Sequence, residues 1–142
     1  MAELSFMALG DPVPQGSKNP YKLKTGQIVL VEAAKGHKSW RATVKTACEL
    51  AGLGSHQLPL DGALVLQVTF VFAKPPNTKF TDFPAGKPDL SKLIRSVEDS
   101  ITSGKGWVDD ARVVDIHAYK RWVGSSTDTY TEPGVLVYVT QK

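Results

Sequence analysis

The stretch KPDLSKLIRSVEDSITSGKGWVDDARVVD, residues 87–115, combines a strong helix signal with six acidic residues. Its apolar residues recur every three or four positions, which predicts an amphipathic helix over residues 89–102 with one buried stripe. The stripe consists of Leu90, Leu93, Ile94, Val97 and Ile101. Pro88 and Asp89 mark the helix start, and Gly104 and Gly106 mark its end. On the polar side, Arg95 and Asp99 are four residues apart, a spacing that favours an ion pair.

The same kinds of pattern predict the helices and strands of the rest of the chain. Apolar residues at helical spacing predict a second amphipathic helix over residues 35–51, with Cys48 on its core side. Runs rich in β-branched and aromatic residues, or alternating in polarity, predict strands. These strands cover residues 4–9, 28–31, 63–73, 112–122 and 134–141. The β-β-α-β-α-β-β order predicts an α+β (mixed α/β) fold, with two helices packed on one curved mixed sheet.

Length and composition narrow the class of protein. The 142 residues fit a single domain, residues 1–142, and 42% hydrophobic with 22% charged residues is typical of a globular chain. A net charge of +3 and a pI near 9.0 favour an anionic partner such as nucleic acid. The lone Cys48 forms no intramolecular disulfide, and no apolar run is long enough for a membrane span. We therefore expect a cytoplasmic protein without a membrane partner.

The acidic residues have two interpretations. If the helix over residues 89–102 packs beside the next strand, Asp89 and either Asp109 or Asp110 converge on one rim of the sheet. Carboxylates beside basic residues suit Mg²⁺ or Mn²⁺ and metal-assisted phosphodiester hydrolysis. In the alternative interpretation, Asp89 is an ordinary helix cap and the other two are ordinary turn residues.

Basic residues gather in two segments before residue 50. The loop PVPQGSKNPYKLKTGQ carries Lys18, Lys22 and Lys24, and we expect it to be polar and exposed. The helix over residues 35–51 carries its cations on one face, which is either a solvated surface or a set of phosphate contacts. Those cations are Lys38, Arg41 and Lys45.

The pattern K-P-D-L-x-K-L-x-R-x-V-x-D, followed by G-x-G-x-W-x-D-D-x-x-V-V-D, resembles the core motif of the RusA family of Holliday junction resolvases, which are often encoded by phages or prophages. The resemblance covers residues 87–122. It implies a Mg²⁺-dependent endonuclease of recombination and repair, with Mn²⁺ as a possible substitute. It also implies a homodimer that grips a four-way DNA junction and cuts two strands symmetrically.

Carried over position by position, the resemblance implies that Asp89 and Asp110 are catalytic and bind the metal. Arg95 stands where the family has a functional lysine. Ser91 stands where the family has a second aspartate, and a neutral hydroxyl is a poorer metal ligand than a carboxylate. We include Ser91 and Asp109 in the expected metal site. The expected DNA contacts are Lys18, Lys22, Lys24, Lys38, Arg41, Lys45, Lys87 and Lys92.

Two other functions remain open at this stage. Ser91 is compatible with a DNA-binding protein of the same fold that does not cut. The same carboxylates also suit a nuclease that acts on flaps, forks or plain duplex. Cleavage of labelled junction, fork and linear DNA in Mg²⁺ separates the three.

Overall fold

The computed structural model describes residues 2–15, 18–22, 28–32, 36–125 and 130–142. Its strands are β1 (Glu3–Leu9), β2 (Lys18–Lys22), β3 (Ile28–Glu32), β4 (Leu64–Phe72), β5 (Val113–Trp122) and β6 (Gly134–Gln141). Its helices are α1 (His37–Ala51), α2 (Leu90–Ser103) and the short 3₁₀ helix η1 (Asp110–Arg112). The predicted α+β fold and element order are confirmed, and β2 is an additional strand.

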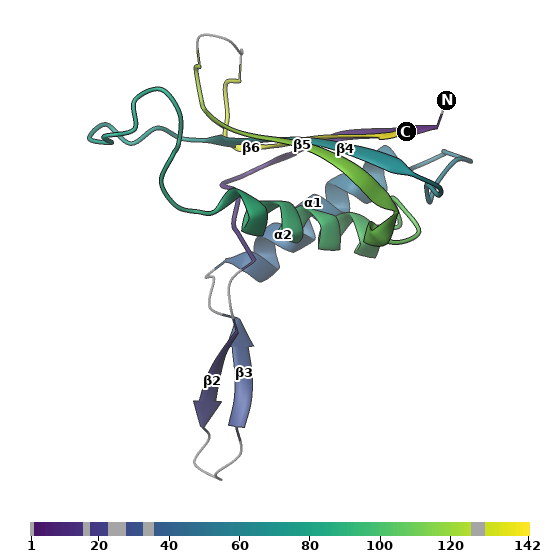
Figure 1. The fold of residues 1–142 in the computed structure, drawn as a ribbon, viewed down its shortest axis with the longest axis horizontal. Coiled ribbons are helices and arrows are strands. Elements are labelled where there is room, and N and C mark those ends of the chain that lie inside the picture. Colours follow the sequence, from purple (N-terminus) through teal and green to yellow (C-terminus); the bar gives the residue numbers. More distant parts are fainter. Residues whose placement is uncertain (1, 16–17, 23–27, 33–35, 126–129) are drawn as a thin grey trace.

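Four strands form the main sheet, in the order β1-β6-β4-β5. β6 runs antiparallel to both of its neighbours, whereas β5 runs parallel to β4. The parallel pair requires a crossover, and α2 supplies it. Figure 1 shows both helices on one face of the sheet. β5 is therefore an edge strand that lies beside α2, and its outer side has no strand partner among the described residues.

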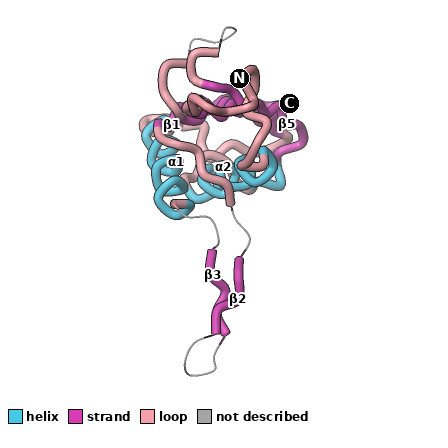
Figure 2. Tube along the Cα trace, turned by 90° about the vertical axis from the view of Figure 1, so that its left-hand side faces the viewer, coloured by secondary structure: helices cyan, strands magenta, loops and turns pink. Residues whose placement is uncertain are grey.

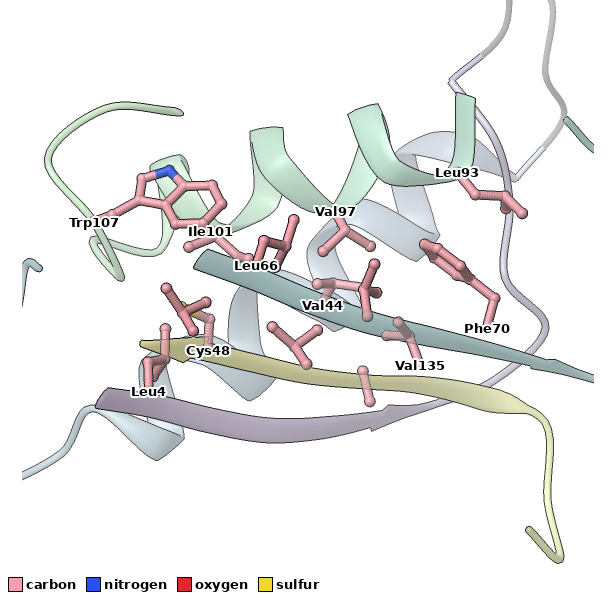
Figure 3. Close-up of a cluster of buried hydrophobic side chains, with 14 of the residues drawn as sticks. Leu4, Val44, Cys48, Leu66, Phe70, Leu93, Val97, Ile101, Trp107 and Val135 are labelled. Carbon is pink, nitrogen blue, oxygen red and sulfur yellow. The ribbon is translucent and has the colours of Figure 1, made fainter. Parts of the chain in front are cut away.

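The core lies between the helices and the sheet (Figure 3). Helix α2 contributes Leu93, Val97 and Ile101, all fully buried, as the apolar stripe predicts. Helix α1 contributes Val44 and Cys48, so the core position expected for this cysteine is confirmed. The buried inward-facing residues of the sheet complete the cluster, among them Leu4, Leu66, Phe70 and Val135.

Strands β2 and β3 form a separate antiparallel hairpin. Figures 1 and 2 show this hairpin standing away from the helices and the main sheet. The sequence analysis placed residues 28–31 in the single curved sheet, and this was wrong. β3 pairs instead with residues 18–22, which were predicted to belong to a polar, basic loop.

No helix in the described part of the chain is long and apolar enough to cross a membrane.

Candidate functional site

The turn after α2 is fixed by a buried tryptophan. Trp107 is 1% exposed, and its indole N–H donates to Thr102 Oγ1 at 2.7 Å. Backbone bonds on both sides of Trp107 join it to Leu60: Leu60 N donates to Gly106 O at 3.0 Å, and Val108 N donates to Leu60 O at 2.9 Å. The W-x-D-D segment is thereby held against the last turn of α2, which defines where its two aspartates lie.

Asp109 and Asp110 have different surroundings in this turn. Asp109 caps η1, because its Oδ1 accepts from Ala111 N at 2.8 Å. This backbone bond lowers the pKa of Asp109. Asp110 has its pKa raised, first by the hydrogen bond with Asp109, then by partial burial and by the negative charges of Asp109 and Asp99. Asp109 thus has a local structural role, whereas Asp110 is exposed beside other carboxylates.

Helix α2 adds two more carboxylates to this end of the molecule. The pKa of Glu98 is raised by burial and then by the charges of Asp110 and Asp99, while Arg95 acts in the opposite direction. We call Glu98, Asp99, Asp109 and Asp110 the acidic cluster. The ion pair expected between Arg95 and Asp99 is absent from the described ion pairs. The cluster therefore concentrates negative charge that a bound cation would relieve.

Asp89 lies at the other end of α2. It occupies the position that precedes the helix, but its carboxylate makes no capping hydrogen bond, and the side chain is exposed. An ordinary cap would use the carboxylate to accept from the first turn of the helix. The interpretation of Asp89 as a helix cap therefore lacks its expected contact, and the carboxylate remains available to a ligand.

Lys120 supports the segment before Asp89, and the sequence analysis did not identify it. From β5, its Nζ donates to Gly86 O and to Pro88 O, each at 2.7 Å. Partial burial lowers the pKa of Lys120, while the charge of Asp89 opposes this shift. The available signal was a lysine on the inward-facing side of a strand, at a position where the alternation predicts an apolar residue.

Within one chain, Asp89 and Asp110 do not converge, so this expectation was wrong. Helix α2 has 14 residues and rises about 1.5 Å per residue, which places its ends roughly 20 Å apart. Asp89 precedes the first turn, whereas Asp110 interacts with Glu98 and Asp99 near the last. Accordingly, no three His, Cys, Asp or Glu side chains of the described residues are arranged to hold a metal ion.

The remaining predicted residues of this stretch are exposed. Ser91 lies in the first turn of α2, and Arg95 follows one turn later on the same side of the helix. Lys87 and Lys92 flank Asp89 and are also exposed. All four surround the Asp89 end of α2, where they can reach a polyanion.

The cations of α1 line a cavity between α1 and α2. The cavity has a volume of about 420 Å³. Lys38, Arg41 and Lys45 line it from α1, and Ser100 and Ser103 line it from α2. Gln15 also contributes. We call this the α1–α2 cavity.

The other predicted DNA contacts cannot be placed in the same way. Lys18 and Lys22 belong to β2, where the structure describes the backbone pairing alone. Lys24 lies outside the described residues.

The arrangement combines exposed carboxylates at both ends of one helix with a cavity lined by cations. These features suit a protein that acts on the phosphodiester backbone of a nucleic acid. The family model described as endodeoxyribonuclease RusA matches residues 11–138, and the chain belongs to this family. The resemblance noted in the sequence is thus confirmed, and the protein is of a nuclease type. No curated protein matches the chain significantly.

Proposed function

We propose that the protein is a Mg²⁺-dependent endonuclease that resolves four-way DNA junctions by paired cuts, with Mn²⁺ as an alternative ion. Membership of the endodeoxyribonuclease RusA family supports this function. The observation that carries the mechanism is the placement of acidic residues at the two ends of α2, directly beside the open edge of β5.

We further propose that a homodimer completes each site. If two β5 edges pair antiparallel, their α2 helices also run antiparallel, and Asp89 of each chain approaches the acidic cluster of its partner. The β5 edge favours such pairing, because Val114 is 60% exposed and Ile116 is 43% exposed there. Two symmetric sites would also match the two-fold symmetry of a junction that is cut in two strands.

The donor set fits a hard divalent cation. Asp89 would contribute one carboxylate and Asp110 another, with Asp109 and the Ser91 hydroxyl at the margin of the site. The pKa of Asp110 is raised first by its hydrogen bond with Asp109, then by burial and by the charges of Asp109 and Asp99, and a divalent cation bound there would offset those charges. A bound Mg²⁺ supplies a nucleophilic water at neutral pH and offsets charge on the phosphate.

Exposed basic side chains of the protein would then hold the DNA. Arg95 extends from the exposed side of α2, one turn beyond Ser91, where its guanidinium can bind a phosphate near the cut. Lys87 and Lys92 add positive charge at the same end of the helix. The cations of the α1–α2 cavity are available for phosphates farther along the arm.

Single substitutions test the site assignment. We expect Asp89→Asn and Asp110→Asn each to reduce junction cutting by more than about a hundredfold while junction binding persists, because each removes a ligand charge and little shape. The matched control is Asp11→Asn, which changes an exposed aspartate outside α2 and η1. Cutting of a labelled junction in Mg²⁺ is the measurement, and full activity in either variant would contradict the assignment.

Mixing the two inactive variants tests the dimeric site. A mixed dimer with one Asp89→Asn chain and one Asp110→Asn chain would contain one intact shared site and one doubly altered site. We therefore expect the mixture to recover single-strand nicking that neither variant shows alone. If both residues acted within one chain, every site in the mixture would stay damaged and no nicking would return.

Ser91 supports one alternative, a junction-binding protein that does not cut. That protein would bind the junction as tightly as an active one and leave it intact in Mg²⁺ and in Mn²⁺. Equal cutting of forks or linear duplex would instead indicate a nuclease for other DNA structures.

A further inference from the structure

The main sheet has a second face, which neither α1 nor α2 covers (Figure 1). Strand pairing places two rows of side chains across this face. The first row is Ser5, Tyr138, Gln67 and His117, and the second row is Met7, Leu136, Thr69 and Tyr119. We call the surface that these residues form the outer face. Two of its tyrosine rings are accessible, because Tyr138 is 42% exposed and Tyr119 is 37% exposed.

Two adjoining pockets lie on the outer face. The larger has a volume of about 390 Å³ and contains Tyr138, whereas the smaller has a volume of about 190 Å³ and contains Tyr119. Both pockets are lined by Gln67, Thr69 and Tyr130. Sites for whole small molecules begin at roughly 300 Å³, so the smaller pocket suits a single ring system rather than a larger compound.

The groups that line these pockets match the chemistry of a nucleobase. A base has two flat faces that stack and an edge of hydrogen-bond donors and acceptors, and tyrosine rings provide surfaces on which it can stack. The Gln67 amide and the Thr69 hydroxyl can donate to and accept from the edge. Among the described residues that line the pockets, Arg121 is the only charged one and none is a carboxylate. The polyanionic backbone that carries a base therefore meets no like charge there.

Contacts within the outer face hold two of the tyrosine rings in place. The Arg121 guanidinium carbon lies 4.9 Å from the centroid of the Tyr119 ring and 5.2 Å from that of Phe83. The Tyr138 hydroxyl donates to Glu3 Oε2 at 2.6 Å. Side chains that are already held in place lose less conformational freedom when a ligand binds, so these rings are prepared for stacking.

The positions of the tyrosines indicate a single strand rather than one isolated base. Tyr138 lies on β6 and Tyr119 on β5, with β4 between them, so two strand spacings separate them by roughly 10 Å across the sheet. Tyr130 lines both pockets. The rings can therefore hold different bases of one strand. In a duplex the bases are paired and stacked on one another, so only unpaired bases can reach these rings.

We propose that the outer face binds single-stranded DNA, with unpaired bases stacked on Tyr119, Tyr130 and Tyr138. DNA is the expected nucleic acid, because the chain belongs to the endodeoxyribonuclease RusA family. The site lies on the opposite face of the sheet from α1 and α2, so it is separate from the acidic cluster and from the α1–α2 cavity. Stacking needs no metal ion, and the site therefore does not depend on the proposed cutting.

Two labelled strands of equal charge test whether bases are bound. One is a short oligothymidylate, and the other has the same length and phosphates but an abasic sugar at every position. Each is titrated with the full-length protein in EDTA, and binding is followed by fluorescence anisotropy. We expect the oligothymidylate to bind roughly tenfold more tightly, because base stacking adds to the phosphate contacts that both strands share. Equal affinities would show that phosphates alone are bound and would overturn the proposal.

Substitutions place the base preference on the outer face. We expect Tyr119→Ala and Tyr138→Ala each to reduce the ratio of the two affinities roughly fivefold, and Tyr119→Phe, which keeps the ring, to change it less than about twofold. The matched control is Leu53→Ala, which removes a side chain that is 74% exposed in the turn after α1. Thermal melts check that every variant is folded. An unchanged ratio in both alanine variants, or an equal loss in the control, would refute the site.

Junction cutting by the same proteins separates this site from the proposed endonuclease. Tyr119→Ala and Tyr138→Ala should still cut a fully paired junction in Mg²⁺, because neither residue belongs to the proposed metal site. A wild-type protein that prefers bases but never cuts would support the outer-face site and reject the endonuclease. A protein that cuts but shows no base preference would reject the outer-face site alone.

Discussion

Asp89 and Asp109 show how the same residue type takes different roles at two positions of one motif that are 20 residues apart. Both precede a helical turn, but the sequence analysis considered a cap at Asp89 and an ordinary turn residue at Asp109. The Asp109 carboxylate makes the capping bond to Ala111 N, whereas the Asp89 carboxylate makes none. Sequence patterns predict which position a residue occupies, but the direction of its side chain depends on packing around it.

Ser91 is the residue at which this chain departs from the family motif. It is exposed in the first turn of α2, two positions after Asp89. An aspartate there adds a carboxylate near the proposed ion, and the helix N-terminus stabilises its charge. We expect Ser91→Asp to lower the Mg²⁺ concentration for half-maximal cutting, and Ser91→Ala to impair cutting less than Asp89→Asn does. A Mg²⁺ titration of junction cutting is the measurement; an Ala variant as inactive as Asp89→Asn would show that the hydroxyl itself is essential.

The thiol of Cys48 provides a test of burial in the core. Burial raises the pKa of this thiol from 9.0 to about 11. Between these values the unfolded chain has lost the proton and the folded chain keeps it, so the free energy of unfolding falls as pH rises. The contribution approaches about 1.4 kcal/mol per pH unit inside that window. Urea unfolding at pH 8, 9 and 10 should show a shallower decline for Cys48→Ala than for wild type; parallel declines would contradict this.

At the scale of elements, periodicity predicted both helices and the main strands within a few residues. The 89–102 prediction compares with Leu90–Ser103, and the 63–73 prediction with Leu64–Phe72. The sequence did not predict which strands pair, because the same alternation of apolar and polar residues is compatible with several neighbouring strands. The separate hairpin was missed for this reason, and so was the parallel pairing of β4 with β5.

The sequence suggested which residues form the site, but it did not predict how they are arranged in space. The motif assigned Asp89 and Asp110 to the expected site, but their spacing along the chain gave no distance in space. Helix α2 lies lengthwise between Asp89 and Asp110, so these two residues are far apart within one chain although they belong to one motif. Lys120 escaped notice because its role depends on carbonyl groups that only the folded chain brings near.

The loop between β4 and α2 is an element whose position depends on side chains from elsewhere. Lys120 holds Gly86 and Pro88, so we expect Lys120→Met to displace Asp89 and raise the Mg²⁺ requirement for cutting by roughly tenfold. The matched control is Lys74→Met, since Lys74 Nζ donates to Thr81 O at 2.7 Å in the same loop. Mg²⁺ titrations of both variants, with thermal melts to compare stability, are the measurements. An equal defect in the control would indicate general loosening of the loop.

For the whole molecule, we expect the two edges of the main sheet to differ in their role in dimerisation. Ile116 lies on the β5 edge and is 43% exposed, whereas Met7 lies on the β1 edge and is 57% exposed. A lysine on an apolar edge strand disfavours pairing with another strand, because the pair would place charges together away from water. We expect Ile116→Lys to give a folded monomer by sedimentation velocity that no longer cuts junctions, and Met7→Lys to remain dimeric and active. A monomeric Ile116→Lys protein that still cuts would show that one chain holds a complete site, and the shared site proposed at the ends of α2 would be wrong. Loss of the dimer in Met7→Lys alone would move the interface to β1, where no acidic residue of α2 could meet its partner.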